Sequence, residues 1–194
     1  MFFQDYDKTG VVYHIAHITD LKKILKNGIE YNDKITYEKH YYSFHDFIDT
    51  LRPDDVPPWV VRKKAIFASM NYRKEPTFHS HTAVLAVKID PTRCWIANEN
   101  RANQIYEPFI LQGIEGFDGA SNYLQTKGKS SVKSYWETSL SFQENLKERK
   151  DLTAGYDAEV MIFHSIPPEA IDILYLVSDH RTLEIEEWKR IFCI

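Results

Sequence analysis

The stretch Gly155-Tyr156-Asp157-Ala158-Glu159-Val160-Met161-Ile162-Phe163-His164 combines a strong strand signal with a carboxylate at the strand's entrance. Val160–Phe163 are consecutive apolar residues, which is typical of a strand buried on both faces. A carboxylate beside such a strand costs free energy unless it is paired or solvated in a cleft. Enzymes often place catalytic groups at strand ends that line clefts. Glu159 is therefore a candidate catalytic carboxylate, and the alternative is a solvated strand-end residue.

The composition favours one compact globular domain. The chain has 194 residues, of which 43% are hydrophobic and 14% aromatic. A chain of this length buries about 70% of its unfolded surface, so we expect it to fold without a disulfide or a metal. Its formal net charge of −4 argues against a protein that coats nucleic acid, because such binding needs an excess of Lys and Arg. Nucleic acid as a substrate remains compatible with this charge.

The cysteine pattern and the apolar runs indicate a cytoplasmic protein. Cys94 and Cys193 are far apart and form no zinc-binding spacing, so a reducing compartment is expected. Met1–Asp7 has early acidic residues and no long apolar run, unlike a signal peptide. No segment approaches the roughly 18 apolar residues of a membrane span. His79 and His81 lack a third ligand nearby, so we expect no metal site.

The local patterns predict an alternation of strands and helices in one α+β domain over residues 1–194. Val11–Ile18 predicts a strand, followed by a helix with Thr19 as its cap and Gly28 as its left-handed terminating residue. Other predicted strands are Ala65–Met70, Thr82–Ile89, Arg93–Ala97 and Ile173–Val177. Other predicted helices are Tyr37–Phe47, Ser131–Arg149 and Arg181–Ile191. Irregular backbone is expected over Arg52–Pro58 and over Gly113–Gly128, where a helix at the start of the second segment is the alternative.

Three separated segments resemble the ADP-ribosyltransferase superfamily. Tyr13–Ile18, with the helix that ends at Gly28-Ile29, resembles the opening motif of the DarT-type DNA ADP-ribosyltransferase toxins. Ala158–Ile162 with Pro167-Pro168 resembles the closing motif, which is an acid-bearing strand followed by a proline-led turn. Ala65–Met70 falls where many members of the superfamily have their middle motif.

The resemblance implies an α+β fold of the ADP-ribosyltransferase type, with a split mixed sheet around a central NAD cleft and flanking helices. It implies NAD as co-substrate and Glu159 as the catalytic acid. Cleavage of the nicotinamide–ribose bond develops oxocarbenium character, which a fixed carboxylate stabilises. Asp157 lies on the same strand face as Glu159 and is the implied substrate-binding residue. The implied cofactor-binding residues are His14, which would hold the adenosine side, Ala16, Arg52, Ser69 and Tyr72, which would stack on the nicotinamide.

The sequence departs from the family pattern at several positions, and these departures affect the prediction of the acceptor more than the prediction of the fold. Ala16 stands where the family usually has Thr, and Arg52 in the proline-rich loop is the best positional match to an NAD-contacting arginine. The predicted function is transfer of ADP-ribose from NAD to a macromolecule, with DNA, RNA and protein all open as acceptors. A DarT-like toxin would modify a base in single-stranded DNA and have an antitoxin partner. The alternatives are a non-catalytic NAD- or nucleotide-binding interaction module of the same fold, and 2′-phosphotransfer from RNA to NAD.

Overall fold

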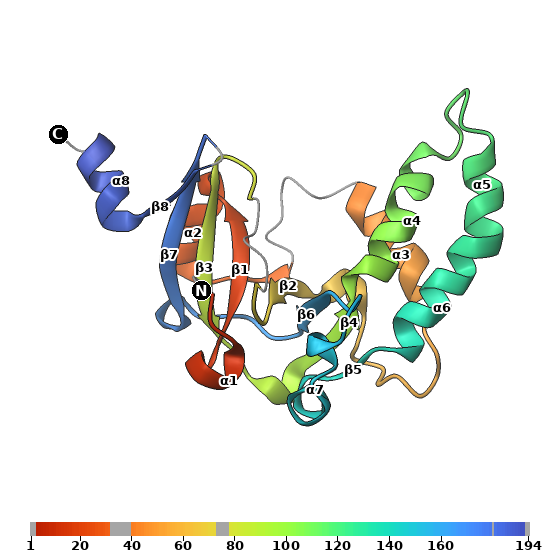
Figure 1. The fold of residues 1–194 in the computed structure, drawn as a ribbon, viewed down its shortest axis with the longest axis horizontal. Helices are drawn as coiled ribbons and strands as arrows, with labels where there is room; N and C mark the ends of the chain where they lie inside the picture. Colours follow the sequence, from red (N-terminus) through yellow and green to blue (C-terminus); the bar gives the residue numbers. More distant parts are fainter. Residues whose placement is uncertain (1–2, 32–39, 73–77, 180, 193–194) are drawn as a thin grey trace. The chain divides into compact units, whose positions relative to one another are not determined.

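The computed structural model describes residues 3–31, 40–72, 78–179 and 181–192. The chain forms two compact units, each assembled from separate segments of the sequence. The first unit comprises Met1–Glu30, Phe67–Asp90 and His164–Ile194, and the second comprises Tyr31–Ile66 and Pro91–Phe163. Both contain helices and strands (Figure 1), which confirms the α+β class. The narrower ADP-ribosyltransferase fold, and its extent over the whole chain as one domain, stay predictions.

The first unit is built on antiparallel strands in the order β2-β1-β3-β7-β8 (Figure 1). β1 pairs with β3 along its whole length, and both are rich in the branched and apolar residues that favour strands. An aromatic cluster around Phe3, Tyr13 and Phe78 fills part of this unit's core. The strands are β1 (Val11–His17), β2 (Ile66–Ser69), β3 (Thr82–Lys88), β7 (Ile171–Ser178) and β8 (Arg181–Glu184). The helices are α1 (Tyr6–Thr9), α2 (Leu21–Asn27) and α8 (Ile185–Phe192).

His17 caps the 3-10 turn that follows β1, and α2 itself begins after Asp20 without a side-chain cap. The Nδ1 atom of His17 accepts a hydrogen bond from the backbone N–H of Thr19 at 3.3 Å, and a 3-10 turn over Ile18–Asp20 precedes the helix. The prediction of Thr19 as the helix cap was wrong, because Thr19 lies inside this 3-10 turn and Asp20 occupies the cap position of α2. Gly28 does end the helix, but with φ 83° and ψ −164° it does not have the predicted left-handed helical conformation, and a Cβ at this position would collide with the carbonyl oxygen of Ile166.

The end of the chain also differs from the prediction. The strand predicted over Ile173–Val177 is confirmed as part of β7, but it is followed by another strand, β8. The predicted helix over Arg181–Ile191 was therefore wrong in its first turn. Leu183 alone is buried in β8, and Leu183 pairs with Leu176 of β7. The pairing of β8 with β7 therefore outweighs the helical spacing of the apolar residues up to Glu184. The helix α8 begins only at Ile185.

The second unit combines antiparallel strands in the order β5-β4-β6 with most of the helices (Figure 1). β4 pairs with both neighbours and is buried at every position. α4 runs antiparallel to α5 and α6 as a helical hairpin (Figure 1). The strands are β4 (Cys94–Asn98), β5 (Leu140–Ser141) and β6 (Ala158–Ile162). The helices are α3 (His40–Asp49), α4 (Glu99–Leu111), α5 (Gly119–Tyr123), α6 (Lys129–Glu137) and α7 (Phe142–Glu148).

Two helical predictions in this unit were wrong. The stretch Gly113–Gly128 was expected to be irregular, but it is helical from Gly119 and continues through a π-helical segment into α6. A Cβ added at Gly128 would lie 3.3 Å from the carbonyl oxygen of Tyr123, which is a tight contact, and 3.6 Å from the Ile105 side chain, which is an ordinary one. The single helix predicted over Ser131–Arg149 is interrupted by β5, because Ser141 pairs with Trp95 and then begins α7 through a capping box.

The other predictions for the second unit agree with the structure. The strands predicted at Arg93–Ala97 and around Glu159 are confirmed as β4 and β6, and Arg52–Pro58 is irregular. The helix predicted over Tyr37–Phe47 is confirmed from His40 onward, and its first three residues lie outside the described residues. α4 was not predicted. None of the described helices is both long and apolar enough to cross a lipid bilayer.

Candidate functional site

Glu159 occupies the second position of β6, opposite Ala97 of β4. The residue is only 5% exposed, which excludes the solvated strand-end alternative. Burial of a carboxylate at this depth costs several kcal/mol unless it is paired and hydrogen-bonded. Its partners therefore determine what this residue can do.

An arginine from a segment distant in sequence binds both carboxylate oxygens of Glu159. Nη2 of Arg62 donates to Oε1 at 3.0 Å and to Oε2 at 2.7 Å. Asp49 of α3 positions the turn that carries this arginine, since its carboxylate accepts the backbone N–H of Arg62 at 2.9 Å. Although burial lowers it, Glu159 and Tyr135 raise the pKa of the Arg62 guanidinium above its ordinary value. The contact is consequently a buried, charge-assisted ion pair.

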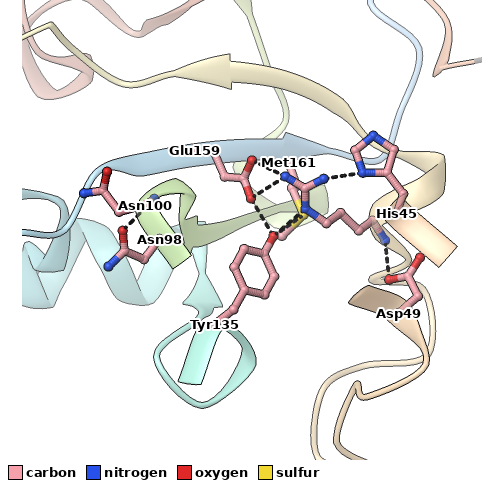
Figure 2. A network of polar contacts seen from close by, with 8 residues as sticks. His45, Asp49, Asn98, Asn100, Tyr135, Glu159 and Met161 are labelled. Atoms are coloured by element: carbon pink, nitrogen blue, oxygen red, sulfur yellow. Dashed lines mark hydrogen bonds and ion pairs between the residues drawn. The ribbon is translucent and has the colours of Figure 1, made fainter. Parts of the chain in front are cut away.

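Tyr135 and His45 complete the network around this ion pair (Figure 2). The phenol of Tyr135, on α6, donates to Oε1 of Glu159 at 2.6 Å and accepts from Nε of Arg62 at 3.0 Å. Burial and the Glu159 charge raise the pKa of Tyr135 well above its ordinary value, so the phenol remains a donor. Nδ1 of His45 contacts Nη1 of Arg62. Because an arginine can only donate, Nδ1 of His45 must be unprotonated.

Two further carboxylates lie at the same end of the β4–β6 pair. Glu99 follows β4 directly as the first residue of α4, and its backbone N–H donates to the carbonyl of Asp157 at 2.7 Å. Asp157 lies two residues before Glu159 and shares its strand face. Burial, followed by the charges of Glu159 and Asp157, raises the pKa of Glu99 to about 7. Carboxyl groups in contrasting environments are a common arrangement for acid–base chemistry.

Asn98 holds the loop before β6 against the start of α4. Its Oδ1 accepts the backbone N–H groups of Asp157 at 3.1 Å and Asn100 at 3.2 Å. Its Nδ2 donates to the Gly155 carbonyl at 3.2 Å, and Figure 2 shows Asn98 beside Asn100. An open hollow of about 540 Å³ adjoins this point and is lined by Asn100, Arg101, Asn103, Gln104, Glu107 and Gly155.

The residues predicted to bind NAD divide between the two units. His14, Ala16, Ser69 and Tyr72 belong to the first unit, whereas Arg52 belongs to the second. Each of them has contacts within its own unit, and their assignment to NAD stays a prediction.

The residues in the first unit are engaged with its core. His14 is buried, and its Nδ1 lies 2.7 Å from the carbonyl oxygen of Phe67. Ala16 is also buried, and Ser69 lies opposite Tyr13 of β1. The ring of Tyr72 packs edge-on against Phe3, with 5.0 Å between the ring centroids.

Within the second unit, Asp157 lies near Glu159, whereas the guanidinium of Arg52 is hydrogen-bonded to backbone carbonyls of its own loop. Nη1 of Arg52 donates to the carbonyl of Val60 at 2.5 Å and to that of Pro58 at 3.3 Å. Arg52 therefore ties together its own proline-rich loop, and Arg62 is the arginine that binds Glu159. The roles of Arg62, Tyr135, His45 and Glu99 were not predicted. Arg62 belongs to the short basic run Arg62–Lys64, and such runs are common on protein surfaces, as residues on one helix face are in protein cores.

Comparison of the chain with protein-family models, curated proteins and solved structures finds no match. Among the residues that the structure describes, no group of three or more His, Cys, Asp or Glu side chains is arranged to hold a metal ion.

Proposed function

We propose that this chain is an NAD-dependent ADP-ribosyltransferase in which Glu159 is the catalytic carboxylate. The observation that carries the proposal is the fixed position of the Glu159 carboxylate, at 3.0 Å and 2.7 Å from Arg62 and 2.6 Å from Tyr135. A carboxylate held in this way needs little reorganisation when positive charge develops beside it.

The proposed reaction is displacement at C1′ of the nicotinamide-bearing ribose. The bond between C1′ and the nicotinamide nitrogen breaks, and its electron pair leaves with neutral nicotinamide. The ribose then carries oxocarbenium character, which the negative charge of Glu159 stabilises. A lone pair of the acceptor forms the new bond to C1′, and the proton that the acceptor loses passes to water. Arg62 and Tyr135 are positioning residues in this scheme, since they act through Glu159.

The co-substrate and acceptor assignments rest on the family resemblance. The resemblance assigns His14, Ala16, Ser69 and Tyr72 of the first unit to NAD, and it assigns Asp157 of the second unit to the acceptor. Arg52 is a weaker candidate for an NAD contact than the sequence suggested, because its guanidinium is bonded to its own loop. The acceptor is a macromolecule, and the DarT resemblance makes a base of single-stranded DNA the first candidate.

Transfer of label from adenine-labelled NAD into a cell lysate tests this function. We expect Glu159→Gln to lower the transfer about 100-fold to 1,000-fold, as the loss of an electrostatic stabiliser does elsewhere. Release of the label by nuclease identifies a nucleic-acid acceptor, and release by protease identifies a protein acceptor. Equal labelling by wild type and Glu159→Gln contradicts the proposal.

Asp151→Asn is the matched control for this experiment. Asp151 is also buried, at 4% exposure, and its Oδ2 pairs with Arg149 at 2.8 Å. The control therefore breaks an ion pair whose carboxylate is likewise buried, although its Arg149 side chain is 23% exposed, without touching Glu159. Melting curves of both variants separate loss of folding from loss of chemistry, since removing one partner of a buried pair costs about 3–5 kcal/mol.

A non-catalytic NAD- or nucleotide-binding module is the second candidate function. The full hydrogen bonding of Glu159 by Arg62 and Tyr135 favours it, because a purely structural ion pair would have the same contacts. Titration calorimetry with NAD, combined with a nicotinamide-release assay, distinguishes the two functions. Binding without release supports the module.

A further inference from the structure

The helix α8 carries an apolar stripe that the described chain does not bury. Ile185, Trp188 and Phe192 recur at helical spacing, and the rings of Trp188 and Phe192 lie 5.1 Å apart, centroid to centroid. No residue of α8 is buried, and Ile191 and Phe192 are 44% and 54% exposed. In Figure 1 the helix lies beyond the edge strand β8, away from the other strands of the first unit. A contiguous exposed stripe of large apolar side chains marks an interaction surface.

Charged residues flank this stripe in a fixed order. The acidic residues Glu186 and Glu187 precede Trp188. The basic residues Lys189 and Arg190 follow it. Helical spacing places one acid and one base, three residues apart, on each flank of the stripe, and on one flank Nζ of Lys189 lies 2.7 Å from Oε1 of Glu186. The acidic half of the helix is therefore complementary in charge to its own basic half.

This order of charges fits a second copy of the same helix running in the opposite direction. A two-fold axis sets residue i of one copy against residue j of the other, and j against i. Two antiparallel copies centred near Trp188 bring the acidic end of each helix to the basic end of the other on both flanks. In a parallel pair, acids would face acids and bases would face bases, which is unfavourable. The charges thus select the orientation, and the apolar stripe supplies the attraction.

The same charges argue against a lipid surface as the occupant of the stripe. α8 has two acidic and two basic residues, whereas helices that lie on membranes are rich in Lys and Arg on their polar face. The order of acids before bases also complements the helix dipole, but the dipole does not account for the apolar stripe between them.

We propose that α8 is a self-association surface, through which two copies of this chain form a two-fold symmetric dimer with their α8 helices antiparallel. This inference is independent of the proposed function. The eight residues of α8 span about 12 Å, so their contact is smaller than the roughly 1,200 Å² of a standard stable interface. The dimer is therefore weak, with a Kd on the order of 100 µM.

Analytical ultracentrifugation of the full chain, from about tenfold below this Kd to about tenfold above it, measures the association. We expect Trp188→Ser to weaken the dimer at least about 30-fold, since a central tryptophan often dominates an interface. Leu25→Ser is the matched control and should leave the Kd unchanged, because Leu25 is an exposed apolar residue, at 45%, on another helix of the first unit. A wild type that stays monomeric throughout, or a dimer that Trp188→Ser does not weaken, overturns the inference.

Charge reversal separates pairing between copies from a structural role of α8. One double variant, Glu186→Lys with Glu187→Lys, makes the charges of the helix wholly basic, and another, Lys189→Glu with Arg190→Glu, makes them wholly acidic. Each variant alone should dimerise at least about tenfold more weakly than wild type, because like charges meet. An equimolar mixture of the two should form a heterodimer. A mixture that does not associate, or unchanged self-association of either variant, contradicts the proposal.

The orientation and the lipid alternative have their own tests. A variant with all four reversals has acids and bases in the opposite order, so it should pair with itself but not with wild type if the helices are antiparallel. Heterodimers of this variant with wild type would show parallel helices and overturn the proposed geometry. A wild type that stays monomeric but cosediments with phosphatidylserine vesicles would assign the stripe to a lipid surface and overturn the dimer.

Discussion

At the scale of single residues, the main feature is a fully bonded ion pair at the end of a strand. Arg62 directs each of its guanidinium nitrogens to a partner: Nε to Tyr135, Nη1 to His45 and Nη2 to Glu159. A buried pair of this type is weak evidence for stability, because hydrophobic replacements are often as stable. The main effect of the network is therefore geometric, because its hydrogen bonds fix the position of the Glu159 carboxylate.

A prediction at this scale concerns the pH dependence of folding. The pKa of Glu99 is raised from 4.5 to about 7 in the folded protein, with burial as the largest cause. Between these values the folded state binds more protons than the unfolded state, so the free energy of unfolding falls as pH rises. This contribution is present below about pH 4.5 and lost above about pH 7, and its size is at most about 3 kcal/mol.

Urea denaturation at pH 5 and at pH 8 measures this effect. We expect Glu99→Gln to lose less stability than wild type over this interval, because glutamine does not ionise. Glu115→Gln should follow the wild-type pH dependence, since Glu115 is exposed. Identical pH slopes for wild type and Glu99→Gln would show that Glu99 titrates normally.

At the scale of elements, the junction after α2 depends on a close backbone approach. Ile29 and Ile166 form an antiparallel bridge, with N···O distances of 2.8 Å and 3.0 Å. Gly28 lies directly before this bridge at a φ of 83°, and a Cβ there would meet the Ile166 carbonyl oxygen. The glycine is thus required by both conformation and space.

We predict that Gly28→Ala lowers the free energy of unfolding by more than about 2 kcal/mol, since backbone strain and a steric clash add together. Gly10→Ala is the matched control. Gly10 also has a positive φ, 68°, but a Cβ at Gly10 would have nothing within 4 Å. Its cost should be only about 1 kcal/mol, the ordinary penalty for a left-handed residue. Equal losses of stability in the two variants, measured by urea denaturation, would contradict the role of the Ile166 contact.

At the scale of the whole molecule, the first unit depends on segments from both ends of the chain. β3 pairs on one side with β1 and on the other with β7. Val84 and Leu85 of β3 have no exposed surface in the folded chain. The central strand of this unit therefore needs residues that follow it by more than eighty positions.

We predict that deleting residues 164–194 abolishes protection of the β3 amides against hydrogen exchange, because it removes the β7 side of the sheet. Deleting residues 185–194 alone should leave β3 protected, because α8 has no buried residue among those described. Hydrogen exchange resolved to peptides covering Thr82–Lys88 measures both. Loss of protection in the shorter deletion would mean that α8 contributes to the core.

The sequence alone determined those elements whose signal is local. β3, β4 and β6 follow from runs of apolar and branched residues, the irregular Arg52–Pro58 segment follows from its prolines, and the end of α2 follows from Gly28. These features depend on side chains and backbone preferences within a few residues, so a pattern is enough to predict them.

The tertiary structure decided the rest, because the deciding contacts join residues far apart in the chain. Arg62 and Glu159 are 97 positions apart, and nothing in a basic run indicates which of its members will be buried. β5 interrupts a helical pattern because Ser141 finds Trp95 as a strand partner. The titration of Glu99 depends on charges and desolvation that exist only when β4 and β6 pair. Strand-forming tendency is local, whereas burial, pairing and electrostatic environment are properties of the assembled fold.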